Sequence, residues 1–98
     1  MAKLSNELVT ECVLGALAKA GGAALPDDWG SLEADARVEA PLDASKLTPR
    51  GRDELIHALR NHLRTYAAYC HIDSTVLDKS ATVADLIAFV QANHQPIP

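Results

Sequence analysis

The four histidines are the first side chains that could do chemistry in this chain, since imidazole is a common metal ligand. They are His57, His62, His71 and His94. His57 and His62 are five positions apart, which separates them by about 140° on a helix, so they do not converge on one ion. We expect His71 and His94 to be solvated or to cap helix ends. The sequence therefore predicts no metal site.

The chain also lacks a pattern typical of nucleophilic catalysis or phosphate binding. Asp53 and His57 lie one helical turn apart and can pair, but no serine or cysteine is positioned beside them. Gly21–Gly22 follows a predicted helix rather than a strand, unlike a phosphate-binding loop. Cys12 and Cys70 have no C-x-x-C or zinc-type spacing, so we expect two reduced thiols in the core. We predict that the protein is not an enzyme.

Charge is unevenly distributed over these 98 residues, whose net charge is −4. Residues 21–47 hold six acids against two bases, and residues 48–71 hold four arginines against two acids. An acidic chain with one modestly basic segment does not favour broad nucleic-acid binding. No stretch approaches the roughly 18–20 apolar residues that span a bilayer, and Glu7 and Glu11 interrupt the apolar run near the N-terminus. We expect a cytoplasmic protein without a membrane segment.

The first predicted helix covers residues 5–20, with Ser5 as its N-cap and Gly21–Gly22 as a left-handed stop. Residues 21–47 then form a long acidic loop, in which SLEADARVEA (31–40) has the pattern of a short helix capped by its serine. Four apolar side chains are expected to pin this loop onto the helices: Trp29, Leu32, Val38 and Leu42.

Two longer helices and one short helix are predicted in the second half of the chain. Thr48 and the proline after it begin a helix over about 49–70, with Asp53 as the alternative start because Gly51 lies near the beginning. A short helix over 73–79 is capped by Asp73, and the last helix, within 80–95, begins with a T-x-x-D capping box. The expected apolar stripe of the second helix is Leu55, Leu59, Leu63, Tyr66, Ala67 and Cys70; that of the last helix is Val83, Leu86, Ile87 and Val90.

The helix signals predict one all-α domain over residues 1–98. No alternating run or hairpin turn predicts a strand. The fold would then depend on burying three apolar stripes against one another, at about 25 cal/mol for each Å² of apolar surface.

Two stretches near the C-terminus resemble the acyl carrier proteins. KSATVADLIAFVQANHQ (79–95) is similar to the closing helix of that family, and HIDSTVLDK (71–79) is similar to the end of its second helix and its short third helix. The resemblance loosely covers most of the chain. It implies a four-helix bundle of three longer helices and one short one, with a long first loop.

The resemblance also implies a serine that carries phosphopantetheine at the start of the second helix, within a D-S-L motif. Counting back 28 positions from Thr82 reaches Glu54, whose neighbours Gly51, Asp53 and Leu55 match the family's pattern. A carboxylate cannot hold a phosphodiester-linked arm, so the chain is not expected to be an ordinary carrier, and no cofactor is expected. Two other serines are alternative attachment sites: Ser45 in LDASKL and, after it, Ser74 in IDST.

The second helix differs from the family in the sign of its charge. The family's second helix is acidic and docks on basic surfaces, whereas here it carries Arg52, His57, Arg60 and Arg64. We therefore expect a non-enzymatic binding or accessory module that docks through this helix on a protein with an acidic or phosphate-bearing surface.

Two alternative functions remain open. The first is a divergent carrier with phosphopantetheine on Ser45. The second is a winged-helix DNA-binding protein, because LTPRGRDEL (47–55) is similar to the segment that leads from the wing into the dimerisation helix of such regulators. Arg50 and Arg52 would then lie near DNA phosphate. No helix-turn-helix pair is predicted upstream, so nucleic acid is not the expected partner.

Overall fold

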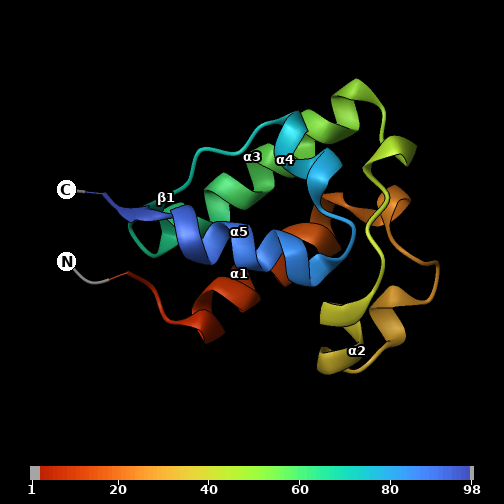
Figure 1. Cartoon of the computed structure of the whole chain (residues 1–98), viewed down its shortest axis with the longest axis horizontal. Coiled ribbons are helices and arrows are strands. Elements are labelled where there is room, and N and C mark those ends of the chain that lie inside the picture. The colour runs from red at the N-terminus through yellow and green to blue at the C-terminus, as the bar shows by residue number, and fades with distance from the viewer. Residues whose placement is uncertain (1–2, 98) are drawn as a thin grey trace.

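The computed structural model describes residues 3–97 and is mostly helical, which confirms the all-α class (Figure 1). The α-helices are α1 (Asn6–Ala20), α2 (Ala34–Glu39), α3 (Pro49–Thr65), α4 (Ser74–Lys79) and α5 (Val83–Asn93). Three short 3₁₀ turns lie at Gly22–Ala24, Trp29–Ser31 and Ala44–Lys46. Two short strands, β1 (Ala68–Tyr69) and β2 (Gln95–Pro96), pair antiparallel.

Helix starts follow the local capping signals of the sequence. The side chains of Ser5, Thr48 and Asp73 each accept a hydrogen bond from a backbone N–H in the first turn of α1, α3 and α4. Thr82 and Asp85 form the predicted capping box of α5. These caps satisfy backbone donors that have no partner within the helix, so a hydroxyl or carboxylate at the right position fixes where the helix begins.

The end of α1 differs from the prediction. Gly21 follows the helix with φ −101°, so the left-handed stop expected at Gly21–Gly22 is wrong. Space rather than backbone handedness requires the glycine, because a Cβ on Gly21 would lie 2.7 Å from Cδ2 of Leu17 and 3.1 Å from its carbonyl oxygen. The chain then tightens into the 3₁₀ turn at Gly22–Ala24.

The end of α3 also differs, and so does the expectation of no strands. The helix ends at Thr65 rather than near residue 70, and Ala67 turns the chain with φ 55°. β1 follows and pairs with β2, with Ala68 opposite Pro96 and Tyr69 opposite Gln95. Tyr66 and Ala67 consequently leave the apolar stripe of α3 and are exposed.

The core lies where α1 packs along α3 and α5, with the short α4 beside α5 (Figure 1). The buried side chains of α3 and α5 are mostly the predicted ones: Leu55, Leu59, Leu63, Val83, Leu86, Ile87 and Val90. The α1 helix buries Cys12, as expected, together with Val9, Val13 and Leu17. Both chain ends lie at the same end of the molecule, where Lys3 Nζ donates to Ala92 O.

Residues 21–47 are folded against the helices, as their apolar side chains predict. Trp29 and Leu42 are buried, and Leu32 and Val38 are partly buried against the core. The α2 helix lies within the predicted stretch, although Glu33 rather than Ser31 occupies its N-cap position. Within residues 3–97, no helix has both the length and the apolar character that crossing a membrane requires.

Candidate functional site

The basic side chains predicted to form a docking face on α3 divide into two kinds. Arg52 is directed into the protein: Nη1 pairs with Asp78 Oδ1 at 2.7 Å, and Nη2 donates to Ala44 O at 2.9 Å. Arg60 Nη2 donates to Ile72 O at 3.2 Å. Both guanidinium groups therefore hold other segments against α3. Arg52 holds α4 and the turn that precedes α3, and Arg60 holds the segment that follows β1.

His57 and Arg64 are the predicted docking residues that remain exposed. They are seven positions apart, which places them on the same side of α3 two turns apart. Arg64 lies in the last turn, where its positive charge also complements the C-terminal end of the helix dipole. The predicted docking residues that are exposed thus lie in the C-terminal half of α3.

Glu54, the residue at the position of the family's attachment serine, is exposed in the second turn of α3. Its Oε1 pairs with Arg50 Nε at 3.3 Å, one turn earlier on the same helix. Because Thr48 caps the helix and Pro49 begins it, Glu54 does not lie at the helix start. The segment DELI (53–56) therefore lies in the second turn of its helix, whereas the resemblance implies that the D-S-L motif lies at the helix start.

Ser45 is exposed in the 3₁₀ turn Ala44–Lys46, just before α3. Its hydroxyl donates to Asp43 Oδ1 at 2.5 Å, and its backbone N–H donates to the same oxygen at 3.1 Å. These two bonds hold the pKa of the Asp43 carboxyl below its ordinary value, and the bond from the Ser45 hydroxyl has the larger effect. Ser74 is also exposed, as the first residue of α4. Both serines belong to local turn and capping structure.

His71 and His94 do not meet, and they have the solvated and capping roles expected for them. His71 is exposed, with Nε2 3.8 Å from Asp73 Oδ2. His94 is fully buried at the C-cap of α5, where Nδ1 lies 2.7 Å from Val90 O and Nε2 accepts from Leu4 N–H at 2.9 Å. A carbonyl can only accept and a backbone N–H can only donate, so Nδ1 carries the proton.

The two cysteines are buried free thiols, as predicted. Burial raises the pKa of Cys12, and it raises the pKa of Cys70 to about 11. Both thiols therefore stay protonated at neutral pH, and a protonated thiol is a poor nucleophile and a poor metal ligand. No three His, Cys, Asp or Glu side chains among the described residues are grouped as a metal site would require.

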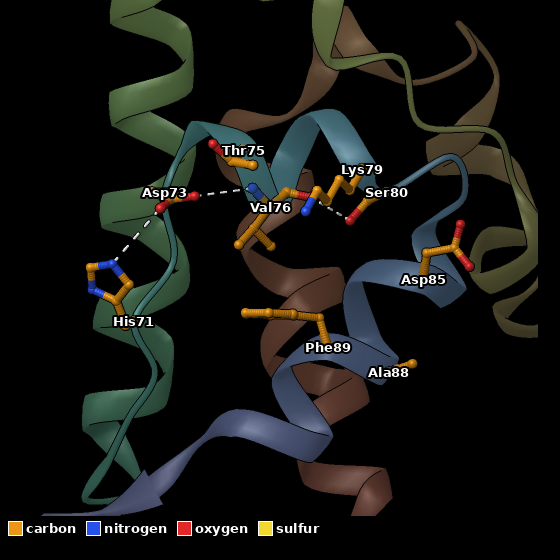
Figure 2. A pocket seen from close by; sticks show the side chains of 9 residues that line it. All are labelled: His71, Asp73, Thr75, Val76, Lys79, Ser80, Asp85, Ala88 and Phe89. Carbon is orange, nitrogen blue, oxygen red and sulfur yellow. Dashed lines mark hydrogen bonds and ion pairs between the residues drawn. The ribbon is translucent and has the colours of Figure 1, made fainter.

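A groove of about 660 Å³ lies between α4 and α5, which the sequence did not predict (Figure 2). Val76 and Lys79 line it from α4, and Phe89 lines it from α5. Its two carboxylates already serve as caps, since Asp73 accepts from Val76 N–H and Asp85 accepts from Thr82 N–H. The groove therefore combines three apolar side chains, Val76, Ala88 and Phe89, with polar ones, and its two acidic side chains already cap helices.

The segment upstream of α3 bears on the winged-helix alternative. Between α1 and α3, residues 21–47 contain one α-helix, α2, which has six residues and buries no side chain. A recognition helix needs a partner helix to hold it in the major groove, and the rest of residues 21–47 consists of short turns and extended chain. This arrangement does not favour DNA recognition.

Comparison with protein-family models, curated proteins and solved structures gives no match for this chain.

Proposed function

We propose that this chain is a non-enzymatic binding module with a helix order like that of the acyl carrier proteins, docking on an acidic or phosphate-bearing protein surface. The observation that carries the proposal is the order of elements: a 15-residue helix, a long pinned segment, a 17-residue helix, a six-residue helix and an 11-residue helix. Packing of α1 against both α3 and α5 supports this likeness.

The acid at residue 54 supports an accessory role over carriage of a thioester. Glu54 is exposed and paired with Arg50, and the first two turns of α3, PRGRDEL, contain no serine or threonine. The docking role then falls on the exposed basic residues at the C-terminal half of α3, His57 and Arg64. Arg52 and Arg60 support it indirectly, because they hold neighbouring segments in place.

Mass spectrometry after co-expression with a broad-specificity phosphopantetheinyl transferase tests this proposal. We expect the purified chain to keep its unmodified mass. An acyl carrier protein expressed in the same cells serves as the positive control. A mass gain of one phosphopantetheine on this chain would overturn the accessory role.

A divergent carrier is the second candidate, favoured by the exposed hydroxyl of Ser45 next to the Asp43 carboxylate. In that case the mass gain would disappear in a Ser45→Ala variant and persist in Ser74→Ala, the matched control at another exposed serine. Persistence of the gain in both variants would exclude both serines as the attachment site.

A further inference from the structure

His94 joins the two ends of the described chain through a bond to the backbone. Its imidazole is fully buried at the C-cap of α5. Nε2 accepts from Leu4 N–H at 2.9 Å, and Nδ1 donates to Val90 O at 2.7 Å. This pair of bonds requires the neutral ring with its proton on Nδ1, because only an unprotonated nitrogen can accept. The bond to Leu4 therefore exists only while the imidazole is uncharged.

The residues before α1 lie beside the C-terminal end of α5 (Figure 1), where two further bonds hold them. Lys3 Nζ donates to Ala92 O at 3.0 Å, and Gln91 Nε2 donates to Leu4 O at 3.4 Å. We call residues 3–5, held by these three bonds, the N-terminal clasp. The bond from Lys3 is exposed to solvent and the bond from Gln91 is long. The bond from Leu4 N–H to the imidazole is therefore the main polar contact of the clasp.

The rest of α1 is anchored independently of the N-terminal clasp. The buried side chains of α1 begin at Val9 and continue to Leu17, and the helix packs against both α3 and α5. Leu4, in contrast, is only partly buried against the core. Lifting the clasp would thus remove three bonds and one partial apolar contact while α1 stays in place. A chain end held by few buried contacts is the kind of segment that opens locally.

Protonation of His94 is incompatible with the closed clasp. The imidazolium carries a proton on both ring nitrogens, so its Nε2–H would face Leu4 N–H, and these two donors would have no acceptor between them. A buried donor without a partner is unfavourable, and burial also disfavours the charged form of the ring. Lifting the clasp removes both penalties, because Nε2–H can then donate to water.

The charged and titratable groups around His94 do not offset its positive charge. Lys3 and Tyr66 line the small cavity beside the ring, and the Lys3 ammonium opposes a second positive charge there. The Lys3 ammonium also acts on the thiol of Cys70, which burial keeps protonated. Glu7 is exposed in the first turn of α1. None of the ion pairs formed within residues 3–97 includes His94.

We propose that His94 is a pH-sensitive switch: protonation of its imidazole breaks the bond to Leu4 N–H and releases the N-terminal clasp from α5, while the helical core stays folded. The closed state binds one proton fewer than the open state, so a lower pH favours opening. Because an imidazole ordinarily titrates between about pH 5 and 8, the clasp should be closed at about pH 7.5 and open at about pH 5. This inference does not depend on the proposed docking role.

NMR spectra of the full chain between about pH 7.5 and about pH 5 test the switch. The ¹⁵N shifts of the imidazole report which ring nitrogens of His94 are protonated, and we expect Nδ1 alone at the higher pH. The protection of the Leu4 amide against hydrogen exchange should fall at least about tenfold at the lower pH. The heteronuclear NOE of residues 3–5 should fall with it. The amide of Leu59, in the middle of α3, should keep its protection because the core remains folded.

A substitution at His94 separates its titration from that of the other histidines. His94→Gln offers an oxygen to Leu4 N–H and an NH₂ group to Val90 O, and it does not titrate in this range. Protection of the Leu4 amide should then no longer depend on pH. His71→Gln is the matched control, since it makes the same substitution at an exposed imidazole, and it should keep the full pH dependence. If His94→Gln does not fold, the spectra of the unaltered chain still decide the question.

Three results would overturn the inference. The first is a protonated His94 beside a Leu4 amide that stays protected. The second is a His94 that stays neutral at about pH 5 with the clasp closed. The third is joint loss of protection at Leu4 and Leu59, which would make protonation part of global acid unfolding. The mass test of the proposed function reads phosphopantetheine attachment, so the failure of one proposal leaves the other standing.

Discussion

At the scale of single residues, Ala67 is the position with the most unusual backbone. It is the one non-glycine residue with positive φ among those that the structure describes. The left-handed conformation brings Cβ close to the backbone and costs an L-residue about 1–2 kcal/mol. Two bonds hold it there, from Ala67 N to Arg64 O at 2.9 Å and from Ile97 N to Ala67 O at 2.8 Å.

Replacing Ala67 by glycine should therefore stabilise the protein. We expect Ala67→Gly to raise the free energy of unfolding by about 0.5–1 kcal/mol, because glycine adopts positive φ without the steric cost, although its unfolded state is more flexible. Urea unfolding followed by CD measures the change. Ala18→Gly, at an exposed position inside α1, should lower it by about 1 kcal/mol. The same sign at both positions would contradict this explanation of the turn.

The residue scale also shows what sequence predicts well and what it does not. The caps at Ser5, Thr48, Asp73 and Thr82 were predicted because each is a bond within one turn of helix. The turn at Ala67 was not, since the sequence there carries no glycine or proline. Its conformation depends on pairing with residues about thirty positions later, which no local pattern encodes.

At the scale of elements, α3 carries two kinds of arginine. Arg52 and Arg60 bond to neighbouring segments, whereas Arg64 is exposed. The predicted docking residues on α3 include His57, Arg60 and Arg64, but the chain that follows β1 lies over α3 and partly buries Arg60. The apolar stripe was predictable because its period is that of the helix itself. Which charged residues stay free depended on where the next segments pack, so the docking face could be predicted only as a helix and not as a set of side chains.

Stability measurements should distinguish the two kinds of arginine. Arg52→Met removes the bonds to Asp78 and Ala44 from a side chain that is only 18% exposed, and we expect it to lower the free energy of unfolding by about 1–2 kcal/mol. Arg64→Met, which keeps a similar aliphatic stem at an exposed site, should change it by less than about 0.5 kcal/mol. Urea denaturation of the two variants provides the comparison. Equal losses would show that Arg64 is also an anchor.

At the scale of the whole molecule, the long acidic segment 21–47 is part of the folded unit rather than an appendage. Leu42 N donates to Ala81 O and Val83 N donates to Ala40 O, so extended chain from the segment pairs with the start of α5. The indole of Trp29 is buried, and its Nε1 donates to Arg37 O. The sequence predicted that apolar side chains pin this segment, but not this backbone pairing.

The single tryptophan makes the cooperativity of the whole domain measurable. Trp29 belongs to the 21–47 segment, whereas the far-UV CD signal comes mainly from α1, α3 and α5. Because the segment shares its core with these helices, we expect Trp29 fluorescence and CD to follow the same urea transition, with equal midpoints and slopes. Trp29→Phe, which keeps a ring in the site, should still unfold in one CD transition. If Trp29 became exposed at a lower urea concentration than the one that unfolds the helices, residues 21–47 would be a separate unit of lower stability. The protein would then be better compared with binding modules in which such a segment becomes ordered on a partner.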